Sequence, residues 1–176
     1  MLGNIVKIWH EELFEIDSEN KEYVESDYEI EYVPIDVSNY KDVELIRGGY
    51  SIQFLKQLSY GDFGYYAMVD GKMVAYGWIK HAKSKDYFFK IEKDCCYLCR
   101  FFTHENSRGH NIYPCLINAL IEHEKECRRF YIDIEKGNIA SEKGLLKVGF
   151  KKIKTIRFFR GFRITFNKFL LRGNCS

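Results

Sequence analysis

The segment from Phe101 to Pro114 carries the residues best suited to binding chemistry. It reads FFTHENSRGHNIYP, in which an apolar run leads through a polar turn with Arg108-Gly109 into the pattern of an amphipathic helix. The first turn of a helix has four backbone N–H groups without partners, at the positive end of the helix dipole. A strand, a tight loop and a helix start can therefore direct several donors at one anion. The segment predicts a polyphosphate-binding site.

A second segment, from Asn138 to Phe150, follows a short apolar strand. It reads NIASEKGLLKVGF, with a good N-cap residue at its start and a glycine stop near its end. Alone, this pattern predicts only a capped helix. Behind an Arg-Gly phosphate loop, it becomes a candidate second part of the same site.

The elements that must position these segments alternate between strands and helices. Periodicity predicts strands at 4–9, 28–35, 65–69, 72–79, 95–103, 130–134, 150–159 and 162–170, and helices at 38–47, 50–59, 112–127 and 138–147. The clearest signal is Asp70-Gly71 between two apolar runs, which predicts a two-residue hairpin turn. This order of elements predicts an α+β fold with one mixed sheet.

The composition bounds the class of protein. A chain of 176 residues with 46% apolar and 16% aromatic residues predicts one folded domain, residues 1–176, and excludes a disordered chain. No apolar stretch approaches the ~20 residues that a membrane span needs. The first apolar run is short and followed by acids, unlike a signal peptide, so we expect a cytoplasmic protein.

The cysteines allow two interpretations. They are Cys95, Cys96, Cys99, Cys115, Cys127 and Cys175. The first three resemble half of a zinc site or a redox pair, but no second pair follows at similar spacing. We expect buried, reduced thiols, which are normal in the cytosol. We expect no bound metal, because the histidines are not spaced as metal ligands.

The net charge of +2 hides an asymmetry along the chain. Residues 11–44 are rich in acids, whereas residues 151–172 carry basic side chains and no acid. Such a tail can bind nucleic acid, anionic lipid or a ligand phosphate, or it can form a solvated strand face. Interleaved aromatic residues keep peripheral membrane contact open. Nucleic acid is the weakest partner class, because it leaves the segment at Asn138 unexplained.

Two motifs and the order of elements resemble the GNAT superfamily of acetyl-CoA-dependent N-acetyltransferases. The family pattern [Arg/Gln]-x-x-Gly-x-[Gly/Ala] corresponds to the residues from Arg108 to Tyr113, with Asn111 and Tyr113 where small residues are usual. Asparagine tolerates the dihedral angles of that glycine better than other residues do. The segment at Asn138 is similar to the family's pattern of Asn, a small residue, an apolar pair, Lys and Gly-Phe.

This likeness spans residues 29–166 and implies a fold. The implied core is a mixed, mostly antiparallel sheet flanked by helices, to which residues 1–27 add an extra N-terminal strand. The sequence Ile112-Tyr113-Pro114 also resembles a GNAT subset associated with surface-polysaccharide synthesis.

The resemblance also implies that acetyl-CoA binds where the strands at 95–103 and 130–134 separate. Its pantetheine arm would pair with strand main chain, and its pyrophosphate would accept from backbone N–H groups. The implied cofactor-binding residues are Phe101, Phe102, Thr103, Arg108, Gly109, His110, Asn111, Ile112, Tyr113, Asn138, Ser141, Lys143 and Lys147. Holding thioester and amine together lowers the barrier, and a backbone N–H near residue 103 would stabilise the oxyanion.

The groups that would transfer protons follow less directly from the resemblance. Many relatives carry a tyrosine acid where this chain has Leu145, and some carry a glutamate base where it has Tyr97. Tyr97 can act as an acid or hold a water molecule, but an ordinary pKa of ~10 makes it a poor base. His104 has an ordinary pKa suited to a base. Tyr97 and His104 are therefore the catalytic candidates, against the alternatives of a half-buried aromatic and a surface side chain.

The expected reaction is direct attack by a primary amine in a ternary complex. The amino group of an amino sugar or sugar nucleotide is the favoured acceptor, held by aromatic-lined loops at 48–50 and 59–64. The alternative is a catalytically silent member that binds CoA or a partner, favoured by Leu145, Asn111 and Tyr113. We expect a monomer or a homodimer.

Overall fold

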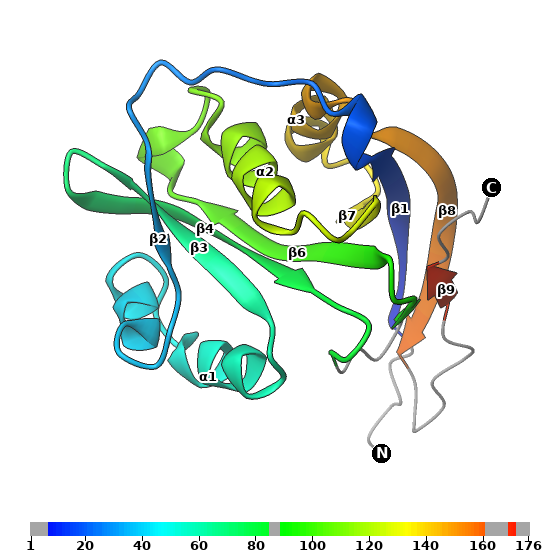
Figure 1. The fold of residues 1–176 in the computed structure, drawn as a ribbon, viewed down its shortest axis with the longest axis horizontal. Coiled ribbons are helices and arrows are strands. Elements are labelled where there is room, and N and C mark those ends of the chain that lie inside the picture. Colours follow the sequence, from blue (N-terminus) through cyan, green and yellow to red (C-terminus); the bar gives the residue numbers. More distant parts are fainter. Residues whose placement is uncertain (1–6, 85–88, 161–168, 172–176) are drawn as a thin grey trace.

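A seven-stranded sheet forms the centre of the computed structural model, which describes residues 7–84, 89–160 and 169–171. The strand order is β2-β3-β4-β6-β7-β1-β8 (Figure 1). The strands are β1 (Lys7–Asp17), β2 (Glu31–Pro34), β3 (Phe63–Val69), β4 (Lys72–Lys80), β6 (Cys95–Thr103), β7 (Arg129–Glu135) and β8 (Lys151–Arg160). Among the described strands of this sheet, only β6 and β7 pair in parallel, so the predicted α+β fold with a mostly antiparallel sheet is confirmed.

Helices cover both faces of this sheet. They are η1 (Ser18–Asn20), η2 (Tyr40–Leu45), α1 (Ser51–Ser59), η3 (Glu105–Ser107), α2 (Ile112–His123) and α3 (Ile139–Val148). The helices α2 and α3 lie over one face, and η2 and α1 over the other (Figure 1). Strand alternation supplies both cores: Ala75 packs toward α2, whereas Tyr76 and Trp78 pack against α1. Within the described residues, no helix is long and apolar enough to cross a membrane.

Most predicted elements are confirmed, with corrections at their ends. The hairpin turn holds Asp70 at φ 50° and Gly71 at φ 70°, as a two-residue turn requires. The helix predicted at 112–127 ends at His123. A short strand pair was not predicted, β5 (Phe89–Ile91) parallel to β9 (Phe169–Leu171). The rest of the strand predicted at 162–170 lies outside the described residues.

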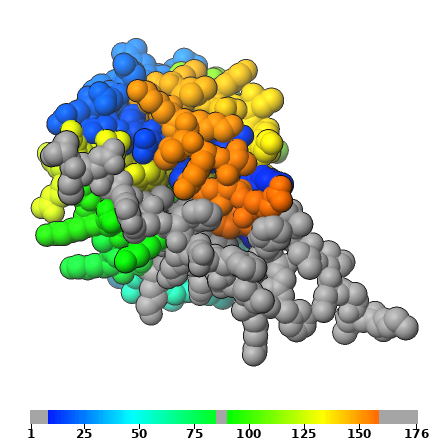
Figure 2. Space-filling view, turned by 90° about the vertical axis from the view of Figure 1, so that its right-hand side faces the viewer, coloured from blue at the N-terminus to red at the C-terminus, as the bar shows by residue number. Residues whose placement is uncertain are grey.

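The N-terminal strand lies inside the sheet. β1 was predicted at 4–9 but extends to Asp17, and it pairs antiparallel with β7 on one side and β8 on the other. Glu15 of β1 thereby lies opposite Lys151 of β8, and Lys152 donates to the buried carboxylate of Glu12. Figure 2 looks at this side of the molecule and shows β8, in orange, at the surface. Part of the charge asymmetry is therefore neutralised within the fold.

A bulge in β6 and a gap beside it prepare the site. Arg100 has a φ of 57°, and the β4–β6 register shifts there, so that Arg100 and Phe101 together oppose Gly77. Parallel pairing of β6 with β7 ends at Leu98 and Ile132, although β6 runs on to Thr103 and β7 to Glu135. The two strands therefore separate, as the resemblance implied.

The cysteines need a correction. Cys96 and Cys127 form a disulfide with a Cα–Cα distance of 6.1 Å, so the expectation of reduced thiols is wrong for this pair. The cause is tertiary: parallel β6–β7 pairing places Cys96 opposite Phe130, close to Cys127, which lies two residues before β7 begins. Cys95, Cys99 and Cys115 are not joined in disulfides. Because β6 alternates, Cys96 packs on the α2 side while Cys95 packs on the other, and the three clustered cysteines do not converge.

Candidate active site

A groove lies between the end of β6 and the first turns of α2 and α3. We call it the α2–α3 groove, and its cavity volume is about 540 Å³. Every residue that the resemblance implies for cofactor binding lines it, except His110. Its walls are completed by Ser107, Pro114, Ala140 and Gly144. The structure thus brings together residues from two distant sequence segments.

The loop before α2 directs backbone donors into this groove. Asn111, the N-cap of α2, adopts the left-handed conformation (φ 58°, ψ 15°) that the family's glycine would adopt easily. The first hydrogen bond of α2 joins Cys115 N to Asn111 O (3.1 Å). The N–H groups of Ile112 and Tyr113 precede that bond, so helix geometry gives them no acceptor within α2. Both are positioned to meet an anion.

Two basic side chains are held at the groove by hydrogen bonds. Lys147 Nζ on α3 donates to Asn111 Oδ1 (2.6 Å), and Asn111 Nδ2 donates to the carbonyl of Glu25 (3.0 Å). Arg108 Nε donates to the carbonyl of Thr103 (3.2 Å). These contacts fix one positive charge on the α3 side of the groove and one beside the end of β6.

Asn138 acts as the cap that its sequence predicted. Its side chain accepts from Ser141 N (3.2 Å), and α3 ends at Gly149 in the left-handed conformation (φ 99°). This arrangement holds Asn138 and Ser141 at the mouth of the groove, where both also line the next cavity.

Tyr113 stands at the boundary between the groove and a second cavity. Its ring packs edge-on against Phe101, with centroids 5.2 Å apart, and both rings line both spaces. A Cβ at Gly144 would lie 2.7 Å from Tyr113 Cδ1, so α3 needs glycine there to accept the ring. Burial, with a smaller effect of Asp133, raises the pKa of the Tyr113 hydroxyl above its usual range. Tyr113 therefore stays protonated at the point where the two spaces meet.

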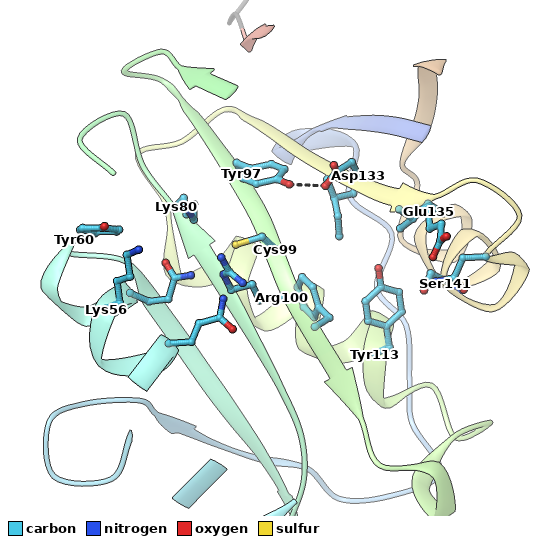
Figure 3. A pocket seen from close by; sticks show the side chains of 16 residues that line it. Lys56, Tyr60, Lys80, Tyr97, Cys99, Arg100, Tyr113, Asp133, Glu135 and Ser141 are labelled. Atoms are coloured by element: carbon cyan, nitrogen blue, oxygen red, sulfur yellow. Dashed lines mark hydrogen bonds between the residues drawn. The ribbon is translucent and has the colours of Figure 1, made fainter. Parts of the chain in front are cut away.

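The second cavity, which we call the α1–β7 cavity, has a volume of about 460 Å³. One wall carries the cations Lys56, Lys80 and Arg100, and the opposite wall carries the carboxylates Asp133 and Glu135 (Figure 3). A ligand in this cavity therefore meets positive charge near α1 and negative charge near β7.

The cationic wall is built by α1 and the β6 bulge. With their amide groups turned to satisfy their neighbours, Gln53 and Gln57 accept hydrogen bonds from the guanidinium of Arg100. Gln57 also donates to Asp62, whose carboxyl is buried. Lys80, at the end of β4, is only 4% exposed. The bulge thus aims an otherwise exposed arginine at α1.

The carboxylates of the acidic wall interact with the side chains of Tyr97 and Glu11. Tyr97 donates a short hydrogen bond to Asp133 across the β6–β7 pair (Figure 3). Glu11 on β1 lies opposite Glu135 in the β1–β7 ladder. Burial, then the carboxylates of Asp133 and Glu135, raise the pKa of Glu11 to about 7. Glu11 does not itself line the cavity, and its raised pKa reflects the crowding of carboxylates behind the acidic wall.

Comparison with known proteins decides the family. The model of the acetyltransferase (GNAT) family matches residues 10–150. The chain belongs to the GNAT family of acetyltransferases. No curated protein matches the sequence.

Solved structures share the GNAT fold at low sequence identity. A functionally unknown conserved protein from Staphylococcus epidermidis has a TM-score of 0.64 and 14% identity, covering 88% of this chain and 62% of that one. A putative GNAT acetyltransferase from Novosphingobium aromaticivorans gives 0.61 and 12%, with coverages of 89% and 66%. The aminoglycoside N-acetyltransferase AAC(6')-Iy in complex with CoA gives 0.61 and 17%, with coverages of 80% and 99%. The chain spans 62% and 52% of the length of the first two similar structures.

The two expected catalytic residues of this GNAT protein lie in different places. Tyr97 lines the α1–β7 cavity. His104 lines neither space. Its side chain caps η3, where Nδ1 accepts from Asn106 N (3.4 Å), and its backbone N–H donates to the carbonyl of Val74. The chain turns outward at His104, so the structure separates this imidazole from the β6–β7 gap.

His110 also departs from the expectation of cofactor contact. Its Nδ1 lies 3.0 Å from Asp27 Oδ2, and its ring packs on Tyr28 at 4.4 Å between centroids. Ser26 Oγ donates to the carbonyl of His110 (2.6 Å). The imidazole therefore fastens the segment before β2 to the loop, outside the groove.

Neither charged wall of the α1–β7 cavity was predicted from the sequence. Asp133 and Glu135 are two residues apart on β7, so both side chains lie on one face of this strand, and they line the same cavity as Tyr97. This period-2 pattern is the signal in the sequence that could have identified them. Arg100 and Lys80 had no such signal, because the bulge that turns Arg100 is a tertiary feature.

Proposed function

We propose that this GNAT protein transfers the acetyl group of acetyl-CoA to a primary amine in a ternary complex. The observation that carries this proposal is the α2–α3 groove at the end of β6, which shares Phe101, Tyr113, Asn138 and Ser141 with a second, charged cavity between β6 and β7. The pyrophosphate would accept from the N–H groups of Ile112 and Tyr113, and Arg108 and Lys147 would balance its charge. The pantetheine arm would lie along Phe101 to Thr103 and carry the thioester past Tyr113.

The acceptor would occupy the α1–β7 cavity. Its amine would face the carboxylates of Asp133 and Glu135, and an anionic part of the same molecule would face Arg100 and Lys80. This charge pattern favours an amine that also bears phosphate or carboxylate, and we therefore keep the amino group of a sugar nucleotide as the favoured class. An amino sugar without an anion would leave the cationic wall unused.

Many relatives carry their tyrosine acid at the position of Leu145, so proton transfer in this chain would use other residues. Leu145 is fully buried in the core and offers no acid. We assign the acid role toward the departing thiolate to Tyr113, whose hydroxyl is kept protonated where the two spaces meet. The carboxylate of Asp133, held by Tyr97, would take the proton from the attacking amine.

Calorimetry with acetyl-CoA and thiol release with an amine library test the proposal together. Lys147→Ala removes a charge held at the groove, and we expect acetyl-CoA to bind about 5–10-fold more weakly, the size of one charge-assisted contact.

Tyr113→Phe should lower kcat by about 10²-fold, a usual contribution of general acid catalysis, with little change in acetyl-CoA affinity. Lys72→Ala, an exposed lysine outside the groove, is the matched control.

The outcomes separate the proposal from its alternative. Absence of acetyl-CoA binding by the wild-type protein would overturn the cofactor assignment. Tight CoA binding without thiol release with any amine would instead favour a catalytically silent member of the family. This alternative is supported by Asn111, Tyr113 and the buried Leu145. A cytoplasmic location and the oligomeric state stay predictions.

A further inference from the structure

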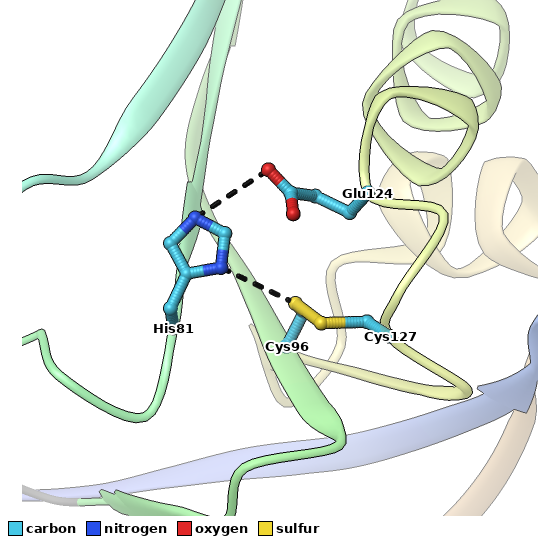
Figure 4. Close-up of side chains that lie close together, drawn as sticks. All are labelled: His81, Cys96, Glu124 and Cys127. Carbon is cyan, nitrogen blue, oxygen red and sulfur yellow. Dashed lines mark hydrogen bonds and ion pairs between the residues drawn. A yellow bond between two sulfur atoms is a disulfide. The ribbon is translucent and has the colours of Figure 1, made fainter.

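A cluster of metal-binding side chains lies away from both cavities. His81 directly follows β4, Cys96 lies on β6, and Glu124 and Cys127 lie between α2 and β7 (Figure 4). One donor atom from each of the four lies within 4.8 Å of all the others. None of the four lines the α2–α3 groove or the α1–β7 cavity. The proposed acetyl transfer leaves the cluster without a role.

The distances fit a zinc site in the reduced protein. His81 Nδ1 lies 3.6 Å from Cys96 Sγ. In a tetrahedral zinc site, Zn–S bonds of ~2.3 Å and Zn–N bonds of ~2.0 Å place sulfur and nitrogen about 3.5 Å apart. Two sulfurs bound to the same tetrahedral zinc ion lie about 3.8 Å apart, which the reduced pair Cys96 and Cys127 can adopt once the disulfide is broken.

The other nitrogen of His81 has the partner that a ligand histidine requires. His81 Nε2 lies 3.5 Å from Glu124 Oε1, across the ring from the sulfur (Figure 4). A carboxylate that accepts from the second imidazole N–H fixes which nitrogen faces the metal. His123 Nε2, at 3.7 Å from the same Glu124 oxygen, adds a second donor to that carboxylate.

The surroundings favour a bound metal that can exchange with solvent. Cys96 is fully buried and Cys127 is 6% exposed, whereas the His81 and Glu124 side chains are 30% and 17% exposed. An open cleft beside the C-terminal end of α2 is lined by Glu124 and Cys127, which gives the ion a route in. Two thiolates and an imidazole are the donor set that zinc prefers among common divalent ions.

We propose that the reduced protein binds one Zn²⁺ ion through Cys96 Sγ, Cys127 Sγ and His81 Nδ1, with Glu124 accepting from His81 Nε2. A dithiol reductant gives two electrons and two protons to the Cys96–Cys127 disulfide and itself becomes a disulfide. The two new thiols then lose their protons as the metal binds, and a water molecule from the cleft completes four-coordination. The ion and the disulfide are alternative links between Cys96 and Cys127.

Metal analysis of the full chain tests this site. The protein is reduced with a phosphine, exposed to Zn²⁺, freed of unbound metal by gel filtration and assayed for zinc. We expect about one zinc per chain for the wild type and for Cys115→Ser, which removes a free thiol outside the cluster. His81→Ala should reduce the zinc content at least tenfold, and Glu124→Gln should weaken zinc affinity about 10–100-fold through its effect on His81. His104→Ala, a histidine outside the cluster, should retain the ion.

Cobalt(II) provides a readout that does not depend on a cysteine variant folding. The reduced wild type with Co²⁺ should show the visible absorption of tetrahedral thiolate coordination, and oxidised protein should not. Less than a tenth of a zinc per reduced chain, or unchanged zinc and cobalt binding in His81→Ala, would overturn the proposal. Neither result depends on acetyl-CoA, so failure of this site is distinct from failure of the proposed acetyl transfer.

Discussion

Glu11 is a single side chain whose ionisation is opposed by the carboxylates of the acidic wall. Its carboxyl pKa is about 7 in the folded protein, because burial and the nearby Asp133 and Glu135 disfavour the charged form. In the unfolded chain the pKa returns to 4.5. Between these values the folded state binds more protons than the unfolded state, so the free energy of unfolding falls as pH rises through this window.

Glu11→Gln should therefore stabilise the protein at pH 8 and leave it nearly unchanged at pH 4.5. We expect a gain of about 1 kcal/mol at the higher pH, reduced from the full linkage value because solvent screens this partly exposed group. Urea unfolding at both pH values measures it. The exposed Glu29→Gln serves as control. An equal gain at both pH values would show that charge is not the cause.

At the scale of elements, Gly77 allows the β6 bulge to bring Phe101 into the site. A Cβ at Gly77 would lie 2.3 Å from the Phe101 ring. Gly77→Ala should therefore displace that ring, lower the free energy of unfolding by about 1–3 kcal/mol and weaken acetyl-CoA binding. Gly48→Ala, whose nearest neighbour would be a Glu44 carboxylate oxygen at 3.8 Å, should change stability by less than about 0.5 kcal/mol. Thermal unfolding and calorimetry of both variants decide whether the tight contact matters.

Element type was predictable where local signals were strong. The Asp70-Gly71 turn, the capped helix at Asn138 and the strand at 95–103 follow from turn chemistry, capping and periodicity, and the structure has all three. The place of β1 between β7 and β8 did not follow, because strand order depends on pairing between residues more than a hundred positions apart. The bulge at Arg100 was not predicted either, because it depends on the tertiary pairing of β6 with β4.

The groove was predictable and the cluster at His81 was not, for one physical cause. The groove comes from two continuous segments whose motifs place backbone and side chains locally. The cluster comes from three separate regions, with His81, Cys96 and the pair Glu124 and Cys127 brought together only by packing. No spacing in the sequence marks such a site, and the nearby run of three cysteines pointed to the wrong partners.

At the scale of the whole molecule, the proposed use of the two spaces predicts a kinetic pattern. The α2–α3 groove and the α1–β7 cavity share Phe101 and Tyr113 at their boundary, so the proposal has both substrates held at once. Direct attack then requires both to bind before either product leaves. The competing route would store the acetyl group on the sulfur of Cys99, which is in no disulfide and lines the α1–β7 cavity.

Initial rates measured at several concentrations of acetyl-CoA and of an active amine distinguish these routes. Direct attack predicts double-reciprocal lines that intersect, whereas an acetylated enzyme predicts parallel lines. Cys99→Ser should keep kcat within about threefold, because direct attack gives the thiol no covalent role. Cys115→Ser, which removes a free thiol that lines neither space, controls for loss of a thiol elsewhere. Parallel lines together with an inactive Cys99→Ser would replace the ternary complex by transfer through Cys99, and would give the α1–β7 cavity a nucleophile in addition to its charged walls.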